Sequence, residues 1–188
     1  MDGSSAFRRA FHIASPVFLG YYLLPPDLGG RISLTSVTLL FVGTAACIEI
    51  ARIALGIRLF GMRPYEGQRL SAYAQGLSGL AFGLFVIQDY RIVVPVFVGM
   101  AWIDPLAALS RRREWPRILP TATYFVLFLG TALLLGAFSL SHALLFGAVT
   151  TATAMVVEGP KLPQLDDDLL MLVVPMTVLA VLLKLLGP

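Results

Sequence analysis

The feature that most restricts how this sequence can fold is a series of long apolar stretches. Residues 124–141 contain no charged side chain, and across the 188 residues 57% are hydrophobic whereas only 13% are charged. A soluble domain of ordinary composition carries roughly a quarter charged residues. A membrane-spanning helix needs about 20 mostly apolar residues. The sequence therefore predicts an all-α integral membrane protein, folded as a polytopic transmembrane helical bundle.

Prolines, glycines and charged clusters divide the chain into apolar segments, each expected to form one spanning helix of a single domain over residues 1–188. The seven segments are 11–24, 32–55, 71–88, 92–109, 118–138, 141–157 and 169–186. The first is short and follows two arginines, as in a secretory signal. It lacks a small-x-small cleavage site, so we expect it to be retained. Gly76, Gly79 and Gly83 share a helical spacing that predicts close helix packing.

The basic residues predict the orientation of these seven spans. Eleven of the fourteen fall on the N-terminal side of the membrane: Arg8, Arg9, Arg52, Arg58, Arg63, Arg69, Arg111, Arg112, Arg113, Arg117 and Lys161. By the positive-inside rule, the N-terminus lies in the cytoplasm and the C-terminus outside. The net charge of +3 thus reflects orientation and not a surface for nucleic acid. Cys47 is the single cysteine, which excludes an intrachain disulfide and a thiolate metal cluster.

The acidic residues gather on the same side, although the positive-inside rule makes no demand on them. Only Asp27 and Asp89 of the eleven acids fall on the other side. The sequence therefore predicts a mixed-charge site facing the cytoplasm, with carboxylates for a divalent cation and arginines for phosphate.

Two sets of ionisable residues fall within or at the ends of predicted spans. Glu49 and Arg52 are three residues apart, so they share a helical face. An ionisable residue inside a span is costly and is a functional candidate by default, although an ion pair that only locks packing is the alternative. Asp104 precedes Pro105, which predicts an interrupted helix with unwound backbone beside a carboxylate. The alternative there is an interfacial aspartate beside a proline kink.

The connection between the last two segments is acidic at both ends. Glu158 ends one segment, and Asp166, Asp167 and Asp168 begin the next. Three adjacent carboxylates repel one another unless one caps the helix or a cation binds them. Because Mg²⁺ is commonly held by one or two carboxylates plus substrate phosphates, we interpret this cluster as a metal site.

A polar loop, residues 58–69, lies between the second and third segments. Its Arg63, Glu66 and Arg69 are suited to closing over phosphates, although the arginines also satisfy the orientation rule without any ligand. His12, at the start of the first segment, is a further candidate for phosphate binding or proton transfer.

At these residues the chain resembles the CTP-dependent lipid-alcohol kinase family, which includes dolichol kinase, phytol kinase and CTP-using diacylglycerol kinases and is related to phosphatidate cytidylyltransferase. The resemblance covers nearly the whole chain. It rests on Arg8-Arg9-x-x-His12, Glu49-x-x-Arg52, Arg63-x-x-Glu66-x-x-Arg69, the Ala101-Trp102-Ile103-Asp104 element, and Glu158 followed by Asp166, Asp167, Asp168 and Pro175. Many relatives also carry a Lys-Ser-x-Glu-Gly loop after the aspartate. Residues 110–120 lack that lysine, and arginine replaces its charge but not its geometry.

The resemblance implies a multi-pass kinase of the cell membrane or an endomembrane that transfers a phosphoryl group from CTP to a lipid alcohol with Mg²⁺. The implied catalytic residues are Asp104, Glu158 and Glu49, the nucleotide or phosphate ligands are His12, Arg52, Arg63, Glu66 and Arg69, and the metal ligands are Asp166, Asp167 and Asp168. Two alternatives stay open: a cytidylyltransferase that forms a CDP-lipid, and a non-catalytic protein that binds or transports lipid. The expected partners are a lipid alcohol, a nucleotide and membrane lipids, with a homodimer as one possible assembly.

Overall fold

The structure is a computed structural model that describes residues 3–30, 32–116, 118–158 and 165–187. The side chains of Pro64, Tyr65, Asp104, Ala108 and Arg112 lie outside this description. The α-helices are α1 (Gly3–Ala14), α2 (Leu34–Ala54), α3 (Ala72–Phe82), α4 (Tyr90–Arg113), α5 (Ile118–Leu134), α6 (Leu140–Glu158) and α7 (Asp167–Leu186). Shorter helical pieces are the 3-10 helices η1 (Ser15–Leu23) and η2 (Pro64–Gln68) and the π-helix η3 (Gly83–Ile87). The all-α prediction is confirmed, with one addition: β1 (Asp27–Leu28) and β2 (Ile32–Ser33) form a small antiparallel ribbon.

Four of these helices are long and apolar enough to cross a membrane among the residues described: Leu34–Leu55, Tyr90–Arg111, Leu140–Glu158 and Asp167–Leu186. Ala72–Ile87 and Ile118–Leu134 are apolar but shorter. The predicted first segment, 11–24, differs most from the structure. Its helix already begins at Gly3 and changes to 3-10 geometry at Ser15, next to Pro16. Proline lacks the backbone N–H that the α-helical ladder requires, which accounts for the change at this point.

Local sequence signals set most helix boundaries. The side chains of Ser33 and Ser71 accept hydrogen bonds from backbone N–H groups in the first turns of α2 and α3, and Asp89 does the same for α4. Such N-caps satisfy donors that have no partner within the helix. Gly56 and Gly136 follow the ends of α2 and α5 with φ of +66° and +59°, a conformation that glycine adopts without steric cost.

The prediction of an interrupted helix at Pro105 is wrong. Helix α4 runs unbroken from Tyr90 to Arg113 with both Pro95 and Pro105 inside it. Neighbouring residues Ile103 and Ala107 are buried in the bundle. Tertiary packing can therefore hold the helical path where the local hydrogen-bond ladder lacks a donor.

The core forms where α4 packs against α5, α7 and α1, with α3 and α6 also packed on α7. Fully buried side chains from four helices meet there, among them Val96, Tyr124, Phe146 and Leu172. The predicted close packing of α3 is confirmed at two glycines. A Cβ on Gly79 would lie 2.6 Å from Leu172, and one on Gly83 would lie 2.9 Å from Val93.

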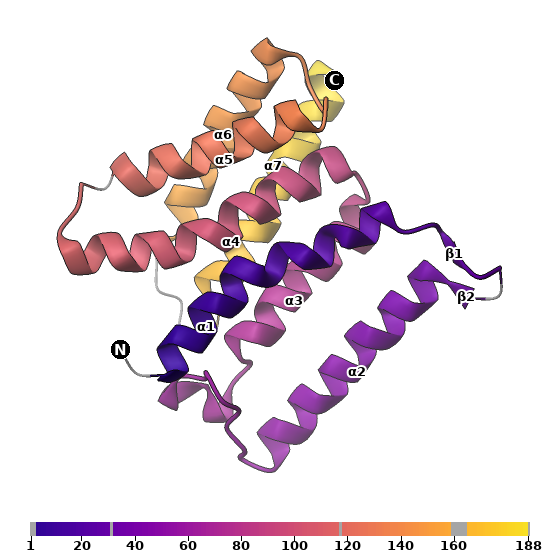
Figure 1. Cartoon of the computed structure of the whole chain (residues 1–188), viewed down its shortest axis with the longest axis vertical. Helices are drawn as coiled ribbons and strands as arrows, with labels where there is room; N and C mark the ends of the chain where they lie inside the picture. Colours follow the sequence, from indigo (N-terminus) through magenta and orange to yellow (C-terminus); the bar gives the residue numbers. More distant parts are fainter. Residues whose placement is uncertain (1–2, 31, 117, 159–164, 188) are drawn as a thin grey trace.

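Helix α2 stands apart from the rest of the bundle (Figure 1). Its principal helix contact is with α3, and many of its apolar side chains are exposed, including Leu39, Leu40 and Ile50. Its middle approaches the bundle at Phe41, whose ring lies 6.1 Å from that of Phe18. The cavity between α2 and the bundle is lined by apolar side chains from both, among them Phe41 of α2 and Phe97 of α4.

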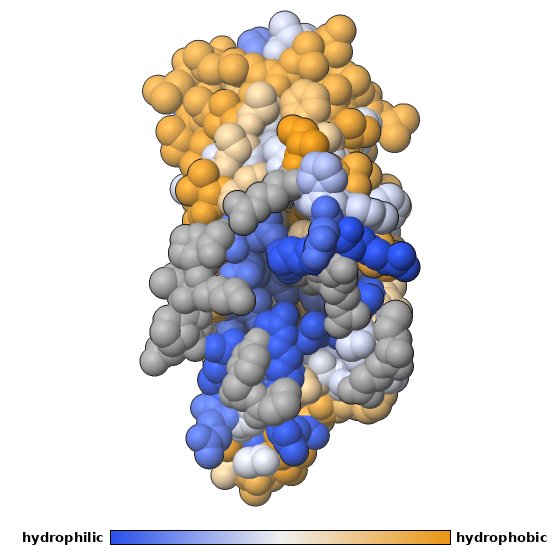
Figure 2. All heavy atoms as spheres, turned by 90° about the vertical axis from the view of Figure 1, so that its left-hand side faces the viewer, coloured by the Kyte–Doolittle hydropathy of each residue, from blue (hydrophilic) through white to orange (hydrophobic). Residues whose placement is uncertain are grey.

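Most helix ends that carry candidate residues lie toward one side of the molecule, whereas the end of α2 with Glu49 and Arg52 lies at the bottom of Figure 1. The start of α1, the ends of α4 and α6 and the start of α7 all point toward the left in Figure 1. Figure 2 shows that side, where hydrophilic residues gather between two hydrophobic zones. The polar surface is thus concentrated where the sequence predicts the site.

Candidate functional site

Glu49 and Arg52 form a buried, bidentate ion pair near the end of α2. Nε of Arg52 donates a hydrogen bond to Oε2 of Glu49 at 2.9 Å, and Nη2 donates to Oε1 at 2.7 Å. The two side chains are only 8% and 2% exposed, respectively. Their spacing of three residues places them on one helical face, and that face is turned toward the loop between α2 and α3.

The same pair fixes that loop. Arg52 donates from Nη1 to the carbonyl oxygen of Glu66 at 3.0 Å and from Nη2 to that of Arg69 at 2.6 Å. Glu49 Oε1 accepts from the backbone N–H of Ser71 at 2.6 Å. All three guanidinium nitrogens of Arg52 are therefore bonded within the chain. This geometry favours the packing alternative, because Arg52 could bind phosphate only by releasing loop carbonyls.

Arg63 lies beside two buried carboxylates, one from its own loop and one from the start of α7. Its Nε is 4.0 Å from Oε1 of Glu66, and its Nη1 is 3.6 Å from Oδ2 of Asp166. The carboxylate side chains are 1% and 7% exposed, whereas that of Arg63 is 34% exposed. Neither oxygen accepts a hydrogen bond from the residues that the structure describes. Burial raises the pKa of the Glu66 carboxyl, and nearby Asp166 adds to this effect, against the influence of Arg63.

Gln75 joins the beginnings of α3 and α7. Its Oε1 accepts a hydrogen bond from the backbone N–H of Asp166 at 2.6 Å, and its Nε2 donates to the carbonyl oxygen of Leu70 at 3.2 Å. Asp166 is the N-cap residue of α7 but its own side chain makes no capping bond. Gln75 was not among the site residues predicted from the sequence. The available signal was an isolated amide in an apolar segment, where exposure to lipid is costly.

His12 connects α1 to the first turn of α7. Its Nε2 lies 3.4 Å from Oδ2 of Asp168, and the two side chains are 12% and 7% exposed. The position of Asp168 near a helix N-terminus also favours its negative charge. Asp166 and Asp168 thus face different partners, Arg63 and His12. Asp166 precedes the helix with extended backbone, whereas Asp168 lies in the first helical turn, so the two side chains leave the backbone in different directions.

The remaining candidate residues are Glu158, Asp167 and Asp104. Glu158, at the end of α6, pairs with Arg111 of α4 at 2.9 Å, so the arginine-rich stretch does reach a predicted site residue. Asp167 lies half-buried in the first turn of α7. Asp104 lies within α4, and its side chain is outside the described part of the chain. Among the residues that are described, no three His, Cys, Asp or Glu side chains form a metal-binding group.

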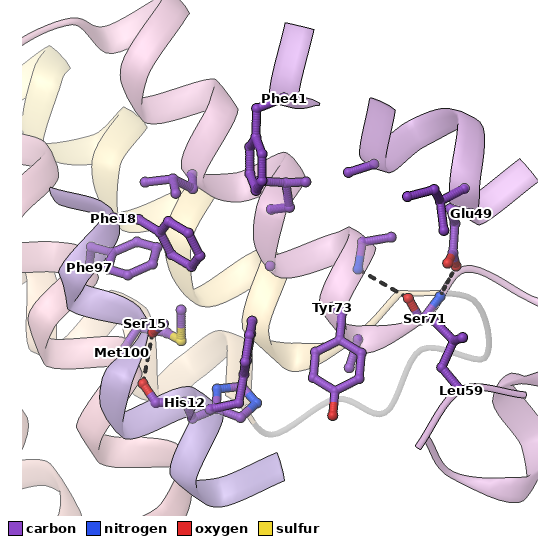
Figure 3. Close-up of a pocket in the computed structure, with 18 residues that line it drawn as sticks. His12, Ser15, Phe18, Phe41, Glu49, Leu59, Ser71, Tyr73, Phe97 and Met100 are labelled. Atoms are coloured by element: carbon purple, nitrogen blue, oxygen red, sulfur yellow. Dashed lines mark hydrogen bonds between the residues drawn. The ribbon is translucent and has the colours of Figure 1, made fainter. Parts of the chain in front are cut away.

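An apolar groove of about 230 Å³ adjoins this charged region (Figure 3). It lies between α1, α2, α3 and α4, and its walls include Phe18, Phe41, Leu77, Leu80, Phe97 and Met100. His12, Tyr73 and Ser71 lie toward one end of the view, and Phe41 lies toward the other (Figure 3). His12 therefore borders both the apolar groove and the acidic start of α7.

Comparison with family models, with curated proteins and with solved structures gave no match. Function must therefore be inferred from the arrangement of the residues described above. Three groups define it: the Glu49–Arg52 pair that holds the loop, the Arg63–Glu66–Asp166 cluster, and His12 between Asp168 and the groove.

Proposed function

We propose that the chain is an integral membrane kinase that transfers a phosphoryl group from CTP to a lipid alcohol. The observation that carries this proposal is the position of His12, which lines the apolar groove and lies 3.4 Å from Asp168. A lipid alcohol needs both environments at once, because its chain must be buried in apolar surface while its hydroxyl meets charged phosphate and metal ligands.

In this proposal all seven helical segments span the bilayer, with the N-terminus and the site facing the cytoplasm. The distribution of Lys and Arg supports this orientation. Hydrophilic residues gather on one side of the molecule (Figure 2). This gathering supports a single charged site at that surface. CTP would reach the site from the aqueous side, and the lipid would enter laterally between helices.

The buried oxygens of Glu66 and Asp166 fit a hard cation, because each lacks a hydrogen-bond donor among the described residues and faces an arginine only at ion-pair distance. Mg²⁺ bound there would neutralise phosphate charge and orient the transferred group. Arg63 is partly exposed and suited to phosphate, with Arg69 on the same loop. Of the metal ligands that the family resemblance implies, Asp166 and Asp167 keep that role in this proposal, Glu66 is added to them, and Asp168 faces His12 instead.

The remaining residues divide into positioning and chemical roles. Glu49 and Arg52 hold the phosphate-facing loop against α2. His12 and Asp168 set the boundary between the groove and the charged cluster. Asp104 and Glu158 are assigned by resemblance to positioning or deprotonating the lipid hydroxyl, whose oxygen then attacks the γ-phosphorus and releases CDP.

A non-catalytic lipid-binding protein is the second candidate. The bonding of Arg52 favours it, because a residue implied as a phosphate ligand is committed to backbone carbonyls. Such a protein would use the groove without any nucleotide chemistry.

The deciding experiment incubates purified protein with γ-labelled CTP or ATP, Mg²⁺ and a panel of polyprenols, phytol and diacylglycerol. The proposal expects label in one lipid class together with release of CDP. Pyrophosphate release would instead identify a cytidylyltransferase, and no turnover with any nucleotide would favour the lipid-binding alternative. Asp104→Asn is expected to abolish transfer, whereas Asp27→Asn, in the ribbon β1–β2, serves as the matched control.

A further inference from the structure

We propose that the groove between α1, α2, α3 and α4 holds one hydrocarbon chain, with the hydroxyl at the His12 end, so that the protein selects single-chain alcohols over diacylglycerols. The identity of the headgroup rests on the proposed kinase function. The selection of one chain rests on the groove alone.

The lining of the groove matches a hydrocarbon chain. Between its ends it presents aromatic, leucine and methionine side chains from four helices: Phe18, Phe41, Leu77, Leu80, Phe97 and Met100. Of its polar members besides His12 and Tyr73, Glu49 accepts a hydrogen bond from the backbone N–H of Ser71, and the Ser15 hydroxyl donates to the carbonyl oxygen of His12. A chain placed there would therefore contact apolar surface along its length, which is the favourable arrangement for burial of hydrocarbon.

The volume of the groove sets how much chain it holds. A cavity of about 150 Å³ binds one benzene, so the observed volume of about 230 Å³ accommodates roughly nine carbon atoms at the same ratio. A diacylglycerol carries two chains from one glycerol, and the same length of both chains would need about twice that volume. The groove therefore fits the part of one chain that is nearest to the hydroxyl.

Beyond the groove lies apolar surface on which the remainder of a longer chain can rest. Phe18 and Phe41 lie on the side away from His12, with ring centroids 6.1 Å apart, and α2 beyond them exposes apolar side chains (Figure 3). A chain that passes these rings meets surface suited to lipid. We therefore expect affinity to rise with chain length until the groove is filled and to change little beyond that length.

Gly76 provides a direct test of occupancy. It lines the groove, and a Cβ built on it meets no atom within 4 Å, so a larger side chain enters empty space without backbone strain. Gly43 is the matched control. It lies in α2, is exposed and also has nothing within 4 Å of an added Cβ, but it does not line the groove.

The experiment measures binding of alcohols to the full chain in nanodiscs, without nucleotide, by native mass spectrometry. The ligands are dioctanoylglycerol and a series of single-chain alcohols. The series runs from chains shorter than about nine carbons, the length predicted to fill the groove, to longer ones. Gly76→Leu is expected to weaken binding of the longer single-chain alcohols at least about tenfold, whereas Gly43→Leu stays within about twofold of the wild type. Affinity is expected to reach a plateau near nine carbons, and dioctanoylglycerol is expected to bind more weakly.

Equal binding of dioctanoylglycerol, or no effect of Gly76→Leu in a protein that retains its melting temperature, would overturn the inference. If Gly76→Leu fails to fold, Ala45→Leu fills the same groove from α2 and makes the same prediction. Because no nucleotide is present, selective chain binding without phosphoryl transfer in the kinase assay would refute the proposed function and leave the groove assignment intact.

Discussion

Glu49→Gln is expected to destabilise the protein by about 3 kcal/mol, because it leaves a buried guanidinium without its countercharge. In the wild type the side chain of Arg52 is 2% exposed and donates to both carboxylate oxygens of Glu49. Glutamine retains one oxygen for the N–H of Ser71, but its amide nitrogen then faces a guanidinium nitrogen, so two donors oppose each other. Removing one partner of a buried ion pair typically costs about 3 to 5 kcal/mol, and the retained oxygen places this case at the lower end.

The assay is equilibrium unfolding in mixed detergent micelles, combined with limited proteolysis of the loop that Arg52 holds. Glu49→Gln and Arg52→Met are measured singly and together. Because both substitutions remove the same interaction, the double variant should be more stable than the sum of the single losses predicts, by about 2 kcal/mol. Cleavage should increase in the loop before α3 in each single variant.

The matched control is Arg111→Ala. Its ion pair with Glu158 has a similar length, 2.9 Å, but Arg111 is 65% exposed. Solvent screens such a pair, so its loss should cost less than about 1 kcal/mol. A loss for Glu49→Gln no larger than that of this control, or two single losses that simply add, would refute a stabilising buried pair between Glu49 and Arg52.

Three further predictions concern helix packing and capping. Gly79→Val should cost about 1 to 3 kcal/mol because an added Cβ meets α7, whereas Gly76→Val should leave thermal stability nearly unchanged; melting curves of the two variants test this pair. Gln75→Leu should cost about 1 to 3 kcal/mol because it leaves a buried backbone N–H at the start of α7 without its acceptor, and hydrogen exchange should report faster opening there. Asp89→Ala should cost about 1 kcal/mol at neutral pH through the lost N-cap. Burial acts to raise the pKa of Asp89, but hydrogen bonds from Arg91 outweigh it and lower the pKa, so the stabilisation is present above the ordinary value of 3.8 and is lost as pH falls through the lower folded-state pKa. Unfolding measured against pH should show this acid-dependent loss in the wild type and not in the alanine variant.

Sequence by itself determined the helical class and the approximate course of the helices. These properties depend on apolar length and on breaks by proline, glycine and caps, all of which act within a few residues. The same local logic correctly placed Glu49 and Arg52 on one helical face and indicated close packing at Gly79 and Gly83. It failed at Pro105, where packing by the rest of the bundle preserves the helix.

Only the tertiary structure decided which partners the polar residues take. Gln75 and Asp166 are 91 residues apart in sequence, and His12 meets Asp168 only because α1 and α7 both pack on α4. The three aspartates of one run looked equivalent in the sequence, yet Asp166 before the helix and Asp168 within its first turn take different partners. The groove likewise exists because α2 stands away from the bundle, a consequence of packing between distant segments that no local pattern encodes.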